Sequence, residues 1–238
     1  MTLESKVKTK NMVEYYCHVF YLYMKQFDII TIFPEIVDPY VQASILGRAQ
    51  SSELISIQTH DLREYTDDKH RRVDDTTYGG GAGMLMKVEP FDRALAEIKK
   101  EKKSRVILTA ASGKPFTQKD AMRLAADYDQ IIFLCGRYEG IDYRVEENLV
   151  DEVFSVGSYV LTGGELPAMT MTDAISRMVP GVVQEESLKE ESHTEEGVLE
   201  YPQYTKPEEY NGWKVPEVLL NGNHKLIEGW REEHSKKQ

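Results

Sequence analysis

Runs of apolar residues recur along the chain and alternate with segments in which apolar residues fall at helical spacing. The runs predict strands at 27–33, 55–59, 105–109, 130–135 and 153–156, and the spacing predicts helices at 90–100, 118–128 and 167–179. Because strands that alternate with helices pair in parallel, we expect an α/β fold with a parallel sheet. Ligands of such sheets bind at the carboxyl ends of the strands, so the residues after each run are the first candidates for a site.

An acidic segment interrupts this pattern at residues 184–196, which contain six glutamates and one lysine and show no periodicity. That composition is typical of a flexible linker. We therefore expect a large domain at 24–183 and a small, helical C-terminal domain at 197–238, with a helix that begins near Asn223. The small domain has too few residues for a large core, so it should pack on the main domain or on a second subunit.

The first 23 residues form an N-terminal extension. Three lysines precede an apolar stretch at 13–23, as in an export signal, but Glu14 and His18 interrupt the stretch and no small-residue cleavage site follows. The stretch is also too short and too polar to span a membrane, which takes about 20 apolar residues. We expect neither export nor membrane insertion.

The chain has 238 residues, of which 41% are hydrophobic and 29% charged, as in a soluble globular protein. Its two cysteines, Cys17 and Cys135, cannot form a disulfide framework, which fits the cytoplasm, and no cluster has the spacing of a zinc site. The net charge of −11 disfavours nucleic acid as a partner. About half of that charge lies in 184–196, however, and basic clusters at 69–72 and 99–103 can face an anionic polymer.

Two glycine-rich turns are the main candidate for chemistry. Residues 135–142 (CGRYEGID) and 160–167 (VLTGGELP) each follow a predicted strand and expose backbone that can meet a flat ligand closely. Two such turns from neighbouring strands can form one pocket. A third glycine run at 78–84 follows the basic cluster and suits a larger anionic substrate, and we expect all three at the ends of strands.

Simpler interpretations exist for each feature. Neither a GxxxxGK[ST] nor a GxGxxG phosphate motif is present, and a single glycine turn is most simply a tight connection. Three such turns in one domain favour a binding role. Asp173 and Arg177 stand four apart on a predicted helix, which favours a surface ion pair. Cys135 is expected in the core, and the histidines at 70, 193 and 224 are most simply structural.

Four motifs together resemble the bacterial tRNA (guanine37-N1)-methyltransferases, which belong to the SPOUT superfamily. They are KHRRVDDTTYGGGAGM at 69–84, GRYEGID at 136–142, YVLTGGELPAM at 159–169 and LEYPQYTKP at 199–207. The resemblance runs from Met24 to about Trp230. It implies a SPOUT domain with a deep trefoil knot, and an obligate homodimer with active sites at the interface. The implied reaction moves a methyl group from S-adenosyl-L-methionine to N1 of guanosine 37, next to the anticodon of tRNA, which maintains the reading frame.

The resemblance also implies roles for individual residues. Arg177 would stabilise charge at O6 of the guanine, and Glu191 would be the base, in place of the aspartate of an Asp-Ser-Phe segment in many relatives. The glutamates at 190, 195 and 196 compete with Glu191 for that role. Implied contacts to the donor come from Leu108, Thr109, Ala110, Gly136, Glu139, Gly140, Val156, Gly157, Tyr159, Leu161, Gly163, Gly164 and Pro167, and implied contacts to RNA from Lys69, His70, Arg71, Arg72 and Lys206.

Two other functions stay open at this point. One is a related SPOUT methyltransferase that acts on ribosomal RNA or on a ribose hydroxyl. The other is a catalytically silent RNA-binding protein that keeps the pocket for structural reasons.

Overall fold

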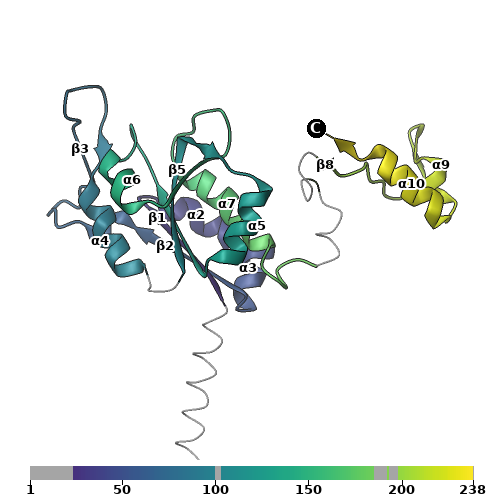
Figure 1. Cartoon of the computed structure of the whole chain (residues 1–238), viewed down its shortest axis with the longest axis horizontal. Coiled ribbons are helices and arrows are strands. Elements are labelled where there is room, and N and C mark those ends of the chain that lie inside the picture. Colours follow the sequence, from purple (N-terminus) through teal and green to yellow (C-terminus); the bar gives the residue numbers. More distant parts are fainter. Residues whose placement is uncertain (1–23, 100–102, 185–191, 193–197, 238) are drawn as a thin grey trace, which may run out of the picture. The chain divides into compact units, whose positions relative to one another are not determined.

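In the computed structural model, the described residues are 24–99, 103–184, 192 and 198–237. The chain divides into two compact units between Val183 and Gln184 (Figure 1). None of the helices in these described ranges is long and apolar enough to cross a membrane.

A five-stranded parallel sheet forms the centre of the first unit. Its strands lie in the order β2-β1-β6-β5-β7 and all neighbours run in parallel, which confirms the predicted fold class. The bounds are Lys25–Thr31 for β1, Ile55–Asp61 for β2, Ser104–Pro115 for β5, Gln130–Cys135 for β6 and Glu152–Ser155 for β7.

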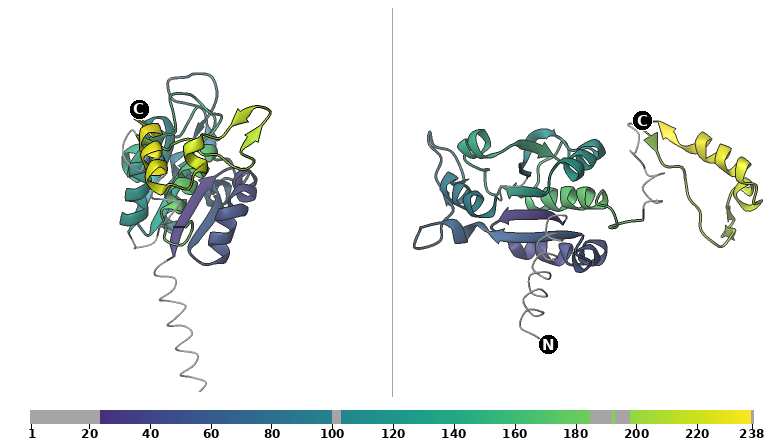
Figure 2. Two further views of the ribbon diagram at one scale, coloured as in Figure 1. Left: turned by 90° about the vertical axis from the view of Figure 1, so that its right-hand side faces the viewer. Right: turned by 60° about the horizontal axis from the view of Figure 1, so that its bottom comes forward.

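Helices cover both faces of the sheet and make three layers (Figures 1 and 2). One face carries α2 (Pro34–Val41), α3 (Ser44–Ser51), α5 (Gln118–Asp127) and α7 (Glu165–Arg177), and the other carries α4 (Val88–Ile98), α6 (Tyr143–Leu149) and the short 3-10 helix η1 (Leu62–Tyr65). Side chains of each strand alternate between the two cores, so that Ile131 and Phe133 face α5 and α7 while Ile132 and Leu134 face α4. All six residues of β6 are buried, which explains their continuous apolar run.

Strand β5 does not stop where its apolar run ends. It continues past Thr109 and crosses β7, so that Phe154 is the register partner of both Thr109 and Lys114. A Cβ at Gly113 would lie 2.6 Å from the carbonyl carbon of Phe154, so only glycine lets the two backbones pass so closely.

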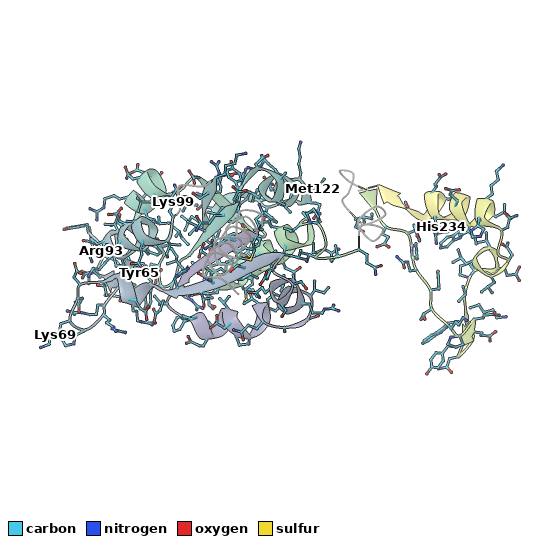
Figure 3. The ribbon with its side chains drawn as sticks, turned by 90° about the horizontal axis from the view of Figure 1, so that it is seen from below. Tyr65, Lys69, Arg93, Lys99, Met122 and His234 are labelled. Carbon is cyan, nitrogen blue, oxygen red and sulfur yellow. The ribbon has the colours of Figure 1, made fainter. Side chains whose placement is uncertain are left out.

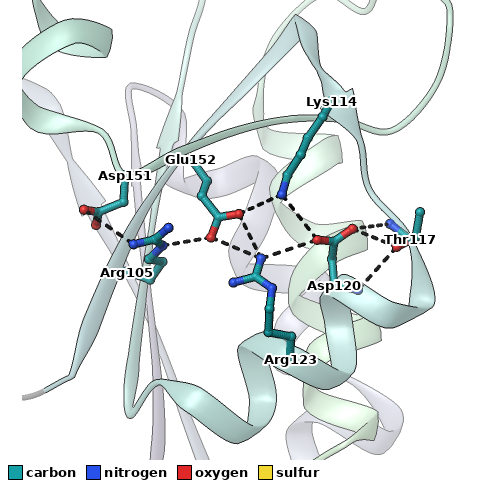
Figure 4. Close-up of polar contacts among 7 residues, drawn as sticks. All are labelled: Arg105, Lys114, Thr117, Asp120, Arg123, Asp151 and Glu152. Carbon is teal, nitrogen blue, oxygen red and sulfur yellow. Dashed lines mark hydrogen bonds and ion pairs between the residues drawn. The ribbon is translucent and has the colours of Figure 1, made fainter.

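An ion network holds this crossing (Figure 4). The carboxylate of Glu152 on β7 accepts hydrogen bonds from Arg105 at 2.8 Å, Lys114 at 2.9 Å and Arg123 at 2.8 Å. Burial of the Glu152 carboxyl opposes its ionisation, but the three donors outweigh burial and lower its pKa from 4.5 to about 2. The network thus joins both ends of β5 to α5 and β7.

The Glu152→Gln variant should be less stable than the wild type by on the order of 2 kcal/mol at pH 7. Because the folded-state pKa lies below the unfolded value, this stabilisation is complete above about pH 4.5 and is lost as the pH falls toward 2. Denaturant midpoints of both proteins at pH 7 and pH 3 measure the difference. The exposed Glu147→Gln on α6 is the control, and an equal, pH-independent loss in both variants would contradict the assignment.

The glycine run at 78–84 is not at the end of a sheet strand, contrary to expectation. It joins β3 (Asp74–Asp75) to β4 (Leu85–Met86), which pair with each other as an antiparallel ribbon. Strands of two residues leave no periodic signal in the sequence, so this ribbon could not be predicted.

In the second unit, the described residues form two small ribbons and two helices. Its elements are β8 (Val198–Leu199) paired with β11 (Lys236–Lys237), β9 (Glu209–Tyr210) paired with β10 (Trp213–Lys214), α9 (Glu217–Leu220) and α10 (His224–His234). The side chain of Asn223 caps α10, which confirms the predicted start of that helix. Trp230 stacks on His234 with ring centroids 4.1 Å apart, and the ring of Tyr204 lies beside that of Trp230. Neither helix of this unit has a buried residue, so its apolar side chains leave a surface that a partner can cover.

Candidate functional site

A cavity of about 440 Å³ lies at the carboxyl ends of β5, β6 and β7, within the size range of small-molecule sites. Most of its lining residues belong to the loops that follow β6 and β7. The lining residues are 108–112, 136–141, 154–156, 159–164, Glu146 and Pro167. This is the edge of a parallel sheet where ligands bind.

The structure brings together nearly all residues that the sequence assigned to a donor pocket. The residues that line the cavity are Leu108, Thr109, Ala110, Gly136, Glu139, Gly140, Val156, Tyr159, Leu161, Gly163, Gly164 and Pro167. Gly157 is not among them; a Cβ there would lie 2.3 Å from the Tyr159 ring, so the absence of a side chain leaves room for that ring. Ten further residues that were not individually assigned to the donor also line the wall, among them Arg137 and Glu146.

The two glycine turns touch directly. The main-chain N–H of Gly164 donates to the carbonyl of Gly136 at 2.9 Å, and the hydroxyl of Thr109 donates to the carbonyl of Gly164 at 3.2 Å. A Cβ at Gly164 would lie 2.8 Å from Cα of Cys135, so glycine is required for this approach. The first turn has positive φ at Tyr138 (59°) and Gly140 (125°), which bends the chain away from β6.

An ion pair that the sequence did not reveal lies next to these turns. Arg137 of the first turn and Glu165 at the start of α7 are 2.9 Å apart (Nη2 to Oε2), and their side chains are 17% and 1% exposed. Arg137 belongs to the motif at 136–142 and Glu165 to the motif at 159–169. Charged residues in surface turns usually face solvent, so the sequence alone does not indicate that this pair is buried.

The electrostatics of the cavity disfavour a phosphate ligand. Arg137 is the single cationic residue of the lining, and its guanidinium is already paired with Glu165, while Glu139 and Glu146 add two carboxylates. Phosphate sites instead present free cations to the ligand, and the helix N-terminus at this wall, that of α7, already carries the carboxylate of Glu165. A flat, uncharged or cationic group with many hydrogen-bonding edges fits this wall better.

The third glycine run adjoins the first turn, although it follows no sheet strand. The N–H of Met86 donates to the carbonyl of Gly140 at 3.0 Å, and the N–H of Glu139 donates to the carbonyl of Met84 at 3.1 Å. A Cβ at Gly83 would lie 2.5 Å from Oε1 of Glu139, so the run covers that carboxylate closely. The motif at 69–84 and the cavity are therefore neighbours.

The basic residues proposed to contact RNA lie in both units. Lys69, His70, Arg71 and Arg72 occupy an exposed loop between η1 and β3, and Figure 3 shows Lys69 at the outer end of its unit. The N–H of His70 donates to Asp68 and lowers the pKa of that carboxyl, with a smaller contribution from Arg72. Lys206 is exposed in the second unit, directly before the cis peptide bond to Pro207.

The proposed catalytic residue Arg177 does not line the cavity. Arg177 is half-buried at the last position of α7 and follows Pro167 by ten positions, about 15 Å along the helix axis. Asp173 accepts a hydrogen bond from the Tyr40 hydroxyl at 2.7 Å, so α2 engages its carboxylate. Glu191 and its competitors at 190, 195 and 196 lie outside the described residues, as does His193.

Cys135 is fully buried at the end of β6, which confirms its prediction as a core residue. Burial, with a smaller effect from Glu165, raises the pKa of its thiol well above the usual value. A neutral thiol is a poor nucleophile, so Cys135 is not a candidate for covalent chemistry.

A parallel sheet with a small-molecule-sized cavity at its carboxyl edge is the arrangement of α/β proteins that bind ligands at that edge. Residues 24–238 match the family model described as tRNA (Guanine-1)-methyltransferase TrmD, and the chain belongs to this family.

Curated relatives agree over most of the chain. It is 52% identical to a tRNA (guanine-N(1)-)-methyltransferase of Macrococcus caseolyticus, over 87% of this chain and 85% of the relative. It is 50% identical to the enzyme of the same name from Lachnospira eligens, over 88% and 89%, and 48% identical to that of Staphylococcus carnosus, over 87% and 84%.

Proposed function

We propose that this protein transfers a methyl group from S-adenosyl-L-methionine to N1 of guanosine 37 of tRNA, next to the anticodon. The observation that carries the proposal is the cavity where the two glycine turns meet, in a chain of the tRNA (guanine-1)-methyltransferase family. A tRNA substrate also fits a cytoplasmic enzyme.

The lining of the cavity fits this donor. Adenine and ribose are flat, uncharged and rich in hydrogen-bonding edges, which main-chain groups of the turns can satisfy. When bound, the donor supplies an electrophilic methyl group on a cationic sulfonium, and Glu139 and Glu146 give the wall the opposite charge. The twelve lining residues named above are the proposed donor contacts.

The reaction needs a base and a cation. N1 of guanine carries a proton, and its electrons become available only as that proton leaves and negative charge moves to O6. We assign the base to Glu191, which takes the proton as the N1–methyl bond forms and the sulfur–methyl bond breaks. We assign the stabilisation of O6 to Arg177, whose planar guanidinium can donate hydrogen bonds to the developing negative charge.

A second subunit completes the site in this proposal. The distance of about 15 Å along α7 between Pro167 and Arg177 is longer than an arginine side chain, which supports delivery of Arg177 from a partner. Apolar side chains at the mouth of the cavity are also unusually exposed, namely Tyr138, Tyr159, Val160, Leu161 and Leu166. Such a patch favours a homodimer that buries it.

The crossing of β5 and β7 supports the deep trefoil knot of this family. Phe154 of β7 pairs with Thr109 and again with Lys114, on either side of the register shift in β5. The chain after β7 then reaches the start of α7, where Gly164 hydrogen-bonds to Gly136 and Thr109. In our proposal the segment after β7 passes through the loop that β5 makes. Residues 69–72 and Lys206 then contact the tRNA.

Transcripts of a proline tRNA with guanosine or adenosine at position 37 test this proposal. With labelled donor, we expect 1-methylguanosine in nucleoside digests of the first transcript and no label in the second. Label on a ribose would favour a 2′-O-methyltransferase. Donor binding in calorimetry without transfer to any tRNA would favour a silent RNA-binding protein.

A further inference from the structure

We infer that Glu165 is a positioning residue for the methyl donor, because its buried carboxylate holds the two glycine turns of the cavity at one fixed spacing. The inference rests on the proposed function, in which those turns bind the donor. Glu165 itself does not line the cavity, so it acts through its neighbours.

The Glu165 carboxylate is held from two sides. The hydroxyl of Thr31 at the end of β1 donates to its Oε1 at 2.6 Å, and Nε of Arg137 donates to the same oxygen at 3.1 Å. Nη2 of Arg137 lies 2.9 Å from Oε2. The carboxylate thus ties the ends of two adjacent strands, β1 and β6, to the first turn of α7.

Arg137 connects Glu165 to the second glycine turn. Its Nη1 donates to the carbonyl of Thr162 at 3.2 Å, and its guanidinium lies over the Phe33 ring at 4.8 Å from the centroid. Arg137 also lines the cavity. One side chain therefore contacts the second turn, the core and the cavity wall while Glu165 fixes its orientation.

Gly163 shows how closely the turn rests on the pair. A Cβ at this position would lie 2.3 Å from Nε of Arg137 and 2.6 Å from Oε2 of Glu165. The backbone of the turn therefore lies directly on the two charged groups. Any shift of the carboxylate moves Arg137, and with it the wall that receives the donor.

Stability alone gives little reason for an ion pair at this place. Taking two charges out of water costs about as much as their attraction returns, and a well-packed apolar pair stabilises as well or better. A charged pair does fix one geometry, since its hydrogen bonds have defined directions. Fixed geometry matters at a methyl-transfer site, where a misplacement of about 1 Å can cost about 10²-fold in rate.

The test uses Thr31, which is fully buried and outside the cavity. Thr31→Val keeps the shape and removes the hydroxyl that holds Glu165, whereas Thr31→Ser keeps the hydroxyl. We expect Thr31→Val to raise the dissociation constant and the KM for S-adenosylmethionine about tenfold or more, as one hydrogen bond to a charged group predicts. We expect no change in the KM for tRNA, and nearly wild-type values for Thr31→Ser.

Glu165→Gln should weaken donor binding more than Thr31→Val, and Glu152→Gln is the matched control because it breaks another ion network, whose residues lie outside the cavity lining. The control should lower the melting temperature and leave the dissociation constant unchanged. Wild-type donor affinity in Thr31→Val would overturn the inference, even if Glu165→Gln fails to fold. If the wild-type protein does not bind S-adenosylmethionine, the proposed function is wrong and the inference falls with it. If the wild-type protein binds the donor and the variants bind it equally well, only the inference is wrong.

Discussion

Replacing Arg177 by alanine should lower the rate of methyl transfer by about 10²–10³-fold, the usual cost of removing a group that stabilises developing negative charge. Removal of an exposed ion pair would instead cost little stability and no rate. Single-turnover kinetics with saturating donor and tRNA measure the effect on chemistry. The melting temperature should change little, and a loss of stability in proportion to the loss of rate would return Arg177 to a structural role.

Mixed subunits show which chain supplies Arg177. Ala110→Trp places a large ring in the wall of the donor cavity and should abolish donor binding. When subunits of Arg177→Ala and Ala110→Trp exchange at random, about half of the dimers combine the two variants, and each of these has one complete site of two. We expect about a quarter of the wild-type activity from two inactive proteins. No recovery after proven exchange would contradict delivery of Arg177 by the partner.

Glu191→Gln should lower single-turnover methylation by about 10²-fold or more, because general acid–base catalysis contributes about 10²–10⁴-fold. Glutamine keeps the size of the side chain and cannot take the N1 proton. Donor affinity, measured by calorimetry, should stay unchanged, since the base acts on the guanine. The fall in rate should be smaller at higher pH, where N1 loses its proton more readily to solvent.

The neighbouring glutamates provide the controls for this variant. Glu190→Gln, Glu195→Gln and Glu196→Gln change the same charge in the same acidic segment. We expect each to keep nearly wild-type turnover. If one of them loses activity while Glu191→Gln keeps it, the base is that residue and the assignment to Glu191 is wrong.

The sheet could be predicted because its signal is local. Every strand of the sheet is an apolar run between turn residues, and the alternation with helices at 118–128 and 167–179 indicates parallel pairing. Helices α2, α3 and α6 were not predicted. They have only seven or eight residues each, and α2 contains Pro39, which usually signals a break. The extension of β5 was missed because pairing with β7, and not hydrophobicity, keeps it extended.

The site could be predicted only in part. Glycines after apolar strands indicated that bare turns would meet, and the cavity joins the turns at 136–140 and 163–164. The partnership of Arg137 with Glu165 could not be predicted, because two charged residues 28 positions apart carry no periodic signal. The distance of Arg177 from the cavity could not be predicted either. It follows from the length of α7 only once Pro167 is known to line the cavity.

The most direct measurement of the central claim is a crystal structure of the protein with S-adenosylhomocysteine, the product that keeps the adenosyl group. We expect one molecule of S-adenosylhomocysteine in each cavity, with its adenine between the turns at 136–140 and 163–164 and hydrogen-bonded to main-chain groups. The side chain of Arg177 from the second subunit should lie at the sulfur end. A ligand bound elsewhere, or a monomer with an occupied cavity and no second chain near it, would contradict the account.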